Sequence, residues 1–455
     1  MRARLAVVAA ALGGLLAASG CRCGGAGADA GSPADAAASS ADGGAPASDS
    51  AAPDLGEWPN AVSFANSDPW IAENHESIRV MRPRVLALNF VNARTNAEML
   101  ALLDQIIAGF REGSRWHGYD DPAAPAFLEY EVAYAIDLRD PTPPPGWPYN
   151  NSTLYPRESP QVGYWGFDYE ALFGPAFAAL YDIRDPDDPS QVLDLCAAVD
   201  RGLVHEVWIY GDADVPDVSA AEVLEMKPPY DLSRHRIPGA PLSLCAGNGC
   251  FDDEGGIPAS CTRSLRIGWV NNTRGPGCYV HGAGHGIEWS ANVSGTLPFF
   301  EPYFRAFGDF NLDARYGLPF DSWYACGGAA GDCLTFTSDT SVDWDVGGGA
   351  TGTIDPYLPA CGNVHLAPNS HDHYDDVSAD TVLSTCRHWR LLDDPAGGDL
   401  AVPFSHSDFA AYDAMLPDCG GGWQIFWRQS MPGLDNGAVD TAGAPLLNWW
   451  PFLFY

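Results

Sequence analysis

Two short segments carry most of the side chains in this chain that could do chemistry. The first is His281-Gly-Ala-Gly-His285-Gly-Ile-Glu288. On a helix, at about 100° per residue, the two imidazoles and the carboxyl group fall within an arc of roughly 60°. Such a face can supply part of a zinc site and leave a position open for water. Each intervening glycine costs a helix about 1 kcal/mol relative to alanine, but glycines let backbone approach closely. The alternative is that the histidines are packed or hydrogen-bonded under a loop.

The second segment spans residues 361–376 and holds three histidines and three carboxylates. His365 follows a cysteine within an apolar run, and we expect it to join the first segment as a ligand. Asp372 and His373 could add a general base and a further ligand, and Asn369 could contact substrate. The alternative for residues 371–373 is a solvated polar loop. Shared coordination requires His365 and the first segment to meet within about 8 Å, because zinc bonds are about 2 Å long.

A third site is expected near Asp212, which follows the apolar run 204–210 together with Asp214. In open α/β sheets, ligands bind outside the carboxyl ends of the strands. Asp212 is therefore a substrate-binding candidate, although acidic residues at such positions also serve as turn residues.

The elements that must position these residues alternate along the first half of the chain. Short apolar or alternating runs predict strands, and periodic segments between them predict helices. Strands are expected at residues 84–91, 127–136, 204–210 and 265–270, and helices at 95–110, 168–182, 190–201 and from about 279. This order predicts an α/β fold with a mostly parallel sheet and helices on both faces.

Beyond residue 295 the sequence is rich in Gly, Pro, Asp and aromatic residues, which predicts a loop-rich part braced by disulfides. A separate small domain starting there is the alternative. Ten cysteines follow Cys21 and Cys23, and an exported chain would pair them. The close pairs Cys245/Cys250 and Cys326/Cys333 could each close a small loop. No Cys-x2-Cys pair occurs among the ten, which disfavours a zinc-thiolate site.

The N-terminus predicts export. Arg2 and Arg4 precede an apolar run over residues 5–18 that ends in Ala-Ser-Gly-Cys21. A run of about fourteen apolar residues is too short for a permanent membrane span. The segment resembles a bacterial lipoprotein signal, which implies lipidation at Cys21 and a lipoprotein of the outer membrane or cell surface. A plain cleaved signal is the alternative.

We therefore expect three regions: a signal peptide (1–20), a disordered tether rich in Ala, Gly, Ser, Asp and Pro (21–55), and a globular α/β domain (56–455) with a possible sub-boundary near 295. The net charge of −35 argues against nucleic acid as a partner. No Walker loop, Gly-x-Ser-x-Gly elbow or Gly-x-Gly-x-x-Gly after the first strand is present.

Several motifs together resemble an uncharacterised family of secreted bacterial proteins. They are residues 84–91, residues 205–211, Gly284-His285-x-x-Glu288, Cys361-Gly-Asn-Val-His365-x-x-Pro-Asn369, and a tail that contains Asn448-Trp-Trp450. The resemblance implies that the histidines, glutamate and asparagine in these motifs belong to a shared pattern, and that His281 is peculiar to this chain. It implies no activity.

From these observations we expect a lipid-anchored, metal-dependent hydrolase that acts on an envelope or extracellular peptide or polysaccharide with a zinc-activated water. The expected metal ligands are His281, His285, His365 and His373, and the expected catalytic residues are Glu288 and Asp372. The rival hypothesis is a non-catalytic protein that binds carbohydrate or another surface through its many aromatic residues.

Overall fold

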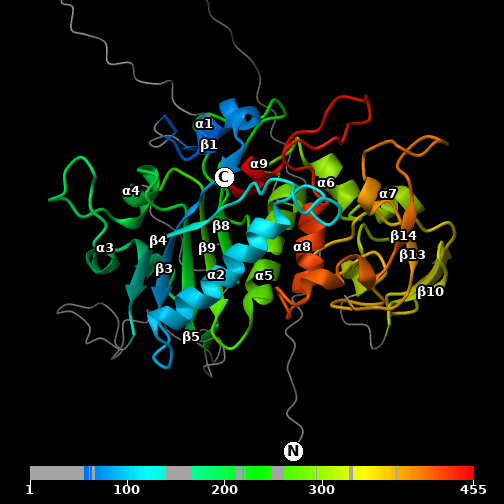
Figure 1. The fold of residues 1–455 in the computed structure, drawn as a ribbon, viewed down its shortest axis with the longest axis horizontal. Coiled ribbons are helices and arrows are strands. Elements are labelled where there is room, and N and C mark those ends of the chain that lie inside the picture. Colours follow the sequence, from blue (N-terminus) through cyan, green and yellow to red (C-terminus); the bar gives the residue numbers. More distant parts are fainter. Residues whose placement is uncertain are drawn as a thin grey trace, which may run out of the picture. The chain divides into compact units, whose positions relative to one another are not determined.

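A five-stranded sheet with strand order β4-β3-β6-β9-β8 forms the centre of the fold (Figure 1). The computed structural model describes residues 56–60, 62–63, 67–139, 165–211, 218–219, 222–247, 249, 261–293, 295–326, 332–375 and 377–455. The predicted signal peptide, the lipidation site Cys21 and the predicted tether lie outside these residues. No helix among them is both long and apolar enough to cross a lipid bilayer.

The central sheet is mixed. Its strands are β3 (Arg84–Asn89), β4 (Glu131–Asp137), β6 (Glu206–Gly211), β8 (Val223–Met226) and β9 (Leu265–Asn271). The pairs β3/β4, β3/β6 and β6/β9 are parallel, whereas β8 runs antiparallel to β9 at the sheet edge. The fold is thus α/β.

The expectation of a mostly parallel sheet is not confirmed for the chain. Besides β8, the three-stranded sheet β10-β11-β12 and the pair β13-β14 are antiparallel. The physical reason lies in the connections, because antiparallel strands can follow one another through a tight turn, as β10 and β11 do, whereas parallel strands need a long crossover. These strands are only three to five residues long, so each gives a weak signal in the sequence.

Both faces of the central sheet are buried. Along β3, Val85 and Ala87 point into one hydrophobic core, while Leu86 and Leu88 point into a second core on the opposite face. The first core includes side chains from α2 (Asn96–Gly113), α5 (Pro276–Glu288), α8 (Gly421–Gln429) and α9 (Trp450–Phe454). The second includes α3 (Pro175–Tyr181) and α4 (Leu195–Asp200). The period-two pattern of the strands therefore sorts helices onto both faces.

Helices α2, α5 and α8 pack against one another on one face, as Figure 1 shows. Helix α2 begins as predicted at Thr95, whose hydroxyl accepts from the Glu98 N–H, while the Glu98 carboxylate accepts from the Thr95 N–H in a capping box. The helix expected from residue 279 begins earlier, at Pro276, a residue favoured in the first helical turn.

The remaining elements are short. They are β1 (Glu57–Trp58), α1 (Ser67–Asn74), β2 (Val80–Met81), β5 (Trp165–Gly166), β7 (Val218–Ser219), α6 (Glu301–Phe307), α7 (Leu312–Tyr316), β10 (Leu334–Ser338), β11 (Ser341–Asp345), β12 (Thr351–Ile354), β13 (Val382–Ser384) and β14 (Val402–Phe404), with single 3₁₀ turns and one π turn (Trp289–Val293) between them.

Disulfides brace the second half of the chain. The described residues contain the pairs Cys196–Cys261, Cys278–Cys419, Cys326–Cys333 and Cys361–Cys386. Of the two close pairs that could each close a small loop, Cys326–Cys333 forms its bridge, whereas Cys250 lies outside the described residues. Two of these bridges, Cys278–Cys419 and Cys361–Cys386, fasten the segments that carry the candidate site.

Candidate metal centre

Three histidines from two distant segments converge at one point. His281 and His285 project from α5, and His365 comes from the loop that follows β12. One ring nitrogen from each lies within 4.8 Å of the other two, a grouping that could hold a metal ion. The closest pair is Nε2 of His285 and Nε2 of His365, which lie 3.1 Å apart. The separation is far below the 8 Å limit for shared coordination.

The start of α5 is fixed from outside the helix. The Gly277 N–H donates to the Asp418 carboxylate (3.0 Å), and the Cys278–Cys419 disulfide ties the same turn to the segment before α8. A first-turn N–H has no acceptor within its own helix, so the carboxylate satisfies it. The negative charge of the carboxylate also interacts favourably with the positive end of the helix dipole. The histidines one and two turns later inherit this fixed register.

Glycines in α5 let the two ligand segments approach each other. A Cβ on Gly284 would lie 2.7 Å from a methyl group of Val364, the residue next to His365. A Cβ on Gly286 would lie 2.9 Å from the Glu225 carboxylate. A larger residue at position 284 would push apart the helix and the loop that carries His365, so Gly284 allows the two ligand segments to meet.

Helix α8 holds the loop that carries His365. Three side chains on one face of this helix donate to three consecutive backbone carbonyls of the loop. The bonds are Trp427 Nε1 to Gly362 O (3.1 Å), Trp423 Nε1 to Asn363 O (3.0 Å) and Gln424 Nε2 to Val364 O (2.8 Å). All six residues are buried, so these carbonyls cannot turn to water instead.

The N–H groups of the same loop also have buried acceptors. The Asp309 carboxylate accepts from the Ala360 and Gly362 N–H groups at 3.1 and 3.2 Å. The Asn363 Oδ1 accepts from the His365 N–H (3.0 Å) and so shapes the turn beneath the ligand. Together with the Cys361–Cys386 disulfide, these bonds fix the His365 backbone before any ligand arrives.

Glu288 lies behind His285. Its Oε2 is 3.2 Å from Nδ1 of His285 and accepts from the Tyr324 hydroxyl (2.8 Å). Its Oε1 accepts from the Val364 N–H (2.8 Å). With both oxygens occupied, Glu288 orients His285 and leaves Nε2 of that ring facing His365. A carboxylate in this place is the usual support of a metal-binding histidine. The structure therefore gives this predicted catalytic residue a positioning contact.

Burial governs the charge of the three rings. Burial first, and then the neighbouring histidines, lower the pKa of His365 to about 2 and that of His281 to about 3. These two rings are neutral at pH 7, and neutral imidazole is the form that binds metals. Burial also opposes a charge on His285, but its hydrogen bond to Glu288 and the charge of that residue outweigh it and raise its pKa.

Aromatic rings surround the histidines. Tyr374 is 58% exposed, and its ring lies 4.3 Å from the ring of His365 and 5.5 Å from that of His281. Its φ of +66° is a backbone conformation that bulky residues rarely adopt. The rings of Tyr324 and His373 each lie 5.1 Å from the His365 ring. Tyr374 thus covers the site on its exposed side.

The other predicted residues have separate contacts. His373 lies beside His365, but its Nε2 bonds the Trp323 carbonyl (3.2 Å), and it is not in the three-histidine group. The Asp372 carboxylate accepts from the His373 N–H. Asn369 is fully buried and donates to the carbonyls of Ser378 and Asp380, so it holds a loop together. Asp212 and Asp214 lie outside the described residues.

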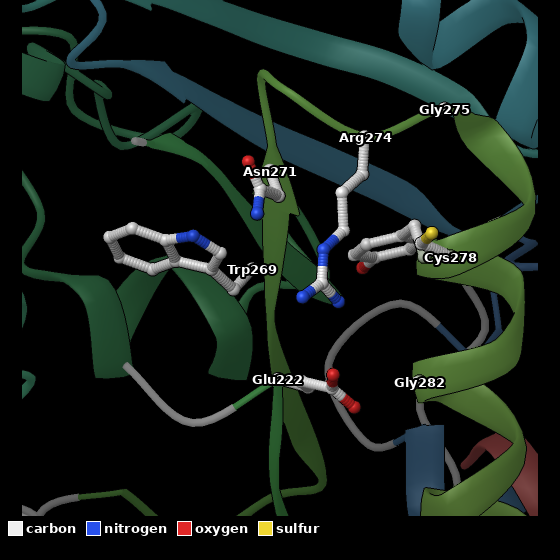
Figure 2. A pocket seen from close by; sticks show the side chains of 8 residues that line it. Glu222, Trp269, Asn271, Arg274, Gly275, Cys278 and Gly282 are labelled. Carbon is white, nitrogen blue, oxygen red and sulfur yellow. The ribbon is translucent and has the colours of Figure 1, made fainter. Parts of the chain in front are cut away.

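A cavity of about 170 Å³ lies where α5 begins (Figure 2). It is lined by Glu222, Trp269, Asn271, Arg274, Gly275, Cys278, Tyr279 and Gly282. Sequence analysis missed Arg274 and Glu222 here, as it missed Tyr324, Asp309 and Asn363 around the histidines. Only the position of Asn271 and Arg274 after a predicted strand could have drawn attention to the cavity.

The chain was compared with models of protein families, with curated proteins and with solved structures. No family model, curated protein or solved structure matches it. Its function must therefore be argued from the site itself.

Proposed function

We propose that this protein is a zinc-dependent hydrolase in which His281, His285 and His365 hold the metal. The 3.1 Å separation of the His285 and His365 Nε2 atoms carries the proposal. Ligand atoms that share a tetrahedral zinc ion at bonds of about 2 Å lie roughly 3.3 Å apart. Chain segments eighty positions apart are thus already at coordination distance.

The alternative for this pair is a simple hydrogen bond in which one Nε2 donates to the other. Two observations favour coordination. The contact of the Glu288 carboxylate with Nδ1 of His285 frees Nε2 as a lone pair, as in known metal sites. The Nδ1 atom of His281 is buried without a hydrogen-bond partner among the described residues. A metal would recover part of the cost of burying three such rings.

A zinc ion held by these three histidines would supply a bound water with a pKa of about 7. The residues of this chain would keep the ligands rigid: Glu288 orients His285, and Tyr324 orients Glu288 in turn. Tyr374 would limit access to the exposed side. We further propose that the N-terminal signal leads to lipidation at Cys21, which would place this site next to an envelope or extracellular polymer.

The rival hypothesis, a carbohydrate-binding surface of stacked aromatic rings, has less support. No tryptophan side chain in the described part of the chain is exposed, and several are fully buried. The side chains of Trp147 and Trp165 lie outside the described part of the structure. Among the described residues, Tyr374 is the only exposed aromatic residue, and its ring lies over the histidines. The aromatic content therefore serves the core.

The test is metal analysis of the full chain, produced in an oxidising compartment and purified without chelator. We expect about one zinc per chain, and loss of that zinc in His285→Ala and His365→Ala. His235→Ala is the matched control, because the His235 side chain is 69% exposed and lies next to Asp231. A wild-type chain that binds no zinc after dialysis against it would contradict the proposal.

A further inference from the structure

We propose that the cavity at the start of α5 binds the free terminal carboxylate of a peptide, so that the site acts on carboxyl ends. This inference rests on the proposed function and names its substrate class. The cavity lies where β9 ends and α5 begins. That edge is where ligands bind in open α/β sheets, because strand ends and helix starts present side chains and N–H groups to the same space.

The cavity presents two sets of hydrogen-bond donors. Arg274 reaches into the space between β9 and α5, as Figure 2 shows. The side chain of Arg274 forms no hydrogen bond or ion pair with any residue in the described part of the chain. A guanidinium fork matches the two oxygens of a carboxylate. In a chain of net charge −35, it is a local attraction for an anionic group.

Asn271 supplies the second set. Its Oδ1 accepts from both the N–H and the hydroxyl of Thr273, each at 2.9 Å. These bonds fix the amide plane and turn Nδ2 away from the Thr273 turn. This Nδ2 has no acceptor among the described residues. Arg274 and Asn271 thus offer donors, and neither offers a free acceptor, which is the arrangement expected for an anionic ligand.

Helix α5 connects the cavity to the histidines, because one of its faces carries residues of both. Cys278, Gly282 and His285 follow each other at spacings of four and three, so they share that face. Gly282 has no side chain that would separate the cavity from His285. In the sequence it lies between two of the proposed metal ligands, His281 and His285. At a rise of 1.5 Å per residue, its level along the helix lies about 4.5 Å from that of His285. A carboxylate held at Arg274 would place a peptide bond near the metal.

Glu222 sets the direction in which a peptide enters. A Cβ on Gly282 would lie 3.5 Å from the Glu222 carboxylate, so that carboxylate lies on the histidine side of the cavity. A substrate carboxylate would be repelled by Glu222 and attracted by Arg274. The small volume of the cavity favours a chain end over the middle of a polymer.

The first test measures binding without metal, so that its result is independent of zinc. N-acetyl-Ala-Ala with a free carboxylate and its amide are titrated into the full chain by calorimetry. We expect the acid to bind at least about tenfold more tightly, because a charge-assisted bond is worth roughly 1.4 kcal/mol or more. In Arg274→Gln this ratio should fall to about two or less. Arg234→Gln, at a half-buried turn position remote in sequence, is the control.

The second test measures cleavage by the zinc-loaded chain with mass spectrometry of the products. We expect loss of single carboxyl-terminal residues from free-acid peptides, a higher KM in Arg274→Gln, and unchanged zinc content. Equal binding of acid and amide, an acid preference that survives Arg274→Gln, or tighter binding of a uronic-acid disaccharide would overturn this inference. Zinc binding with cleavage of amidated peptides would do so too, while leaving the proposed hydrolase intact.

Discussion

Nε2 of His285 lies 3.1 Å from Nε2 of His365, while Nδ1 of His285 lies 3.2 Å from the carboxylate of Glu288. One imidazole thus faces a second imidazole on one side and a carboxylate on the other. The carboxylate in turn accepts from the backbone of the residue before His365. Glu288 therefore links the helix and the loop that supply the ligands, and it is the first residue to test.

Glu288→Gln should weaken zinc binding by about 10- to 100-fold, because support residues of metal-binding histidines contribute to this degree. Glutamine keeps the length of the side chain but loses the negative charge that makes His285 a better metal ligand. Competition with a zinc-binding dye measures the affinity. Glu73→Gln, at an exposed position of α1, is the control and should leave the affinity unchanged. An equal affinity in wild type and Glu288→Gln would show that Glu288 does not support a ligand.

Gly284→Ala should destabilise the protein by roughly 1–3 kcal/mol, as overpacked core positions do. The new methyl group would lie 2.7 Å from Val364, and the loop with His365 must move away. Zinc affinity should fall with it. Gly282→Ala is a matched control two residues earlier in the same helix, where the nearest atom would be 3.4 Å away. Chemical denaturation compares the two variants; equal stabilities would argue against a tight contact between helix and loop.

Asp309→Asn should cost roughly 1–3 kcal/mol of stability, the cost of leaving buried donors without an acceptor. The Asp309 carboxylate accepts from two backbone N–H groups of the His365 loop and from Arg315 (3.0 Å). Its φ is +54°, which asparagine tolerates, so the backbone is preserved. Thermal unfolding measures the loss. Asp313→Asn, at an exposed position of α7, should change stability little; a loss of the same size there would point to a general charge effect.

A fourth prediction concerns the loss of stability in acid that results from His205, a histidine outside the candidate site. His205 is buried, its Nδ1 accepts from the Arg84 N–H (2.9 Å), and burial lowers its pKa to about 3. The unfolded chain, with an ordinary pKa near 6.5, binds a proton that the folded chain does not. The stability from neutral His205 is therefore present above about pH 6.5 and is lost as the pH falls toward 3.

The variant His205→Asn keeps an acceptor for the Arg84 N–H and does not titrate. Relative to wild type, its unfolding free energy should fall less steeply below pH 6.5, by up to about 1.4 kcal/mol per pH unit. Urea unfolding at pH 7, 6, 5 and 4 measures the slope. His117, whose pKa burial lowers to about 4, still titrates in both proteins and contributes equally. Parallel curves for the two proteins would contradict the assigned protonation.

Much of the local structure follows from the sequence. The apolar run at residues 84–89 forms a strand buried on both faces, and Thr95 with Glu98 starts α2 as a capping box predicts. Edge strand β8 escaped prediction because it is four residues long and includes the buried charge of Glu225. That charge is compensated by Arg266 on the neighbouring strand, which bonds it at 3.0 Å, and by Lys227 at 3.3 Å. No local pattern can reveal such a partner.

The candidate site likewise combines features that the sequence predicts with features that only tertiary contacts determine. The spacing of His281, His285 and Glu288 in the sequence was enough to place them on one helical face. It could not determine that Glu288 would turn to His285 and the loop backbone, or that Asn369 would be buried in a loop. Those outcomes depend on which carbonyl and N–H groups the fold leaves nearby, and each buried group must find a partner.

By itself, then, the sequence determined what is local: most strands and helices of the first half, and the helical face with two histidines and a glutamate. Tertiary structure alone decided that His365 meets that face, that Asp309 and α8 hold its loop, and that Arg274 opens into a neighbouring cavity. Spacing within one helix is fixed by backbone geometry, whereas a contact across eighty residues depends on how all the intervening chain packs.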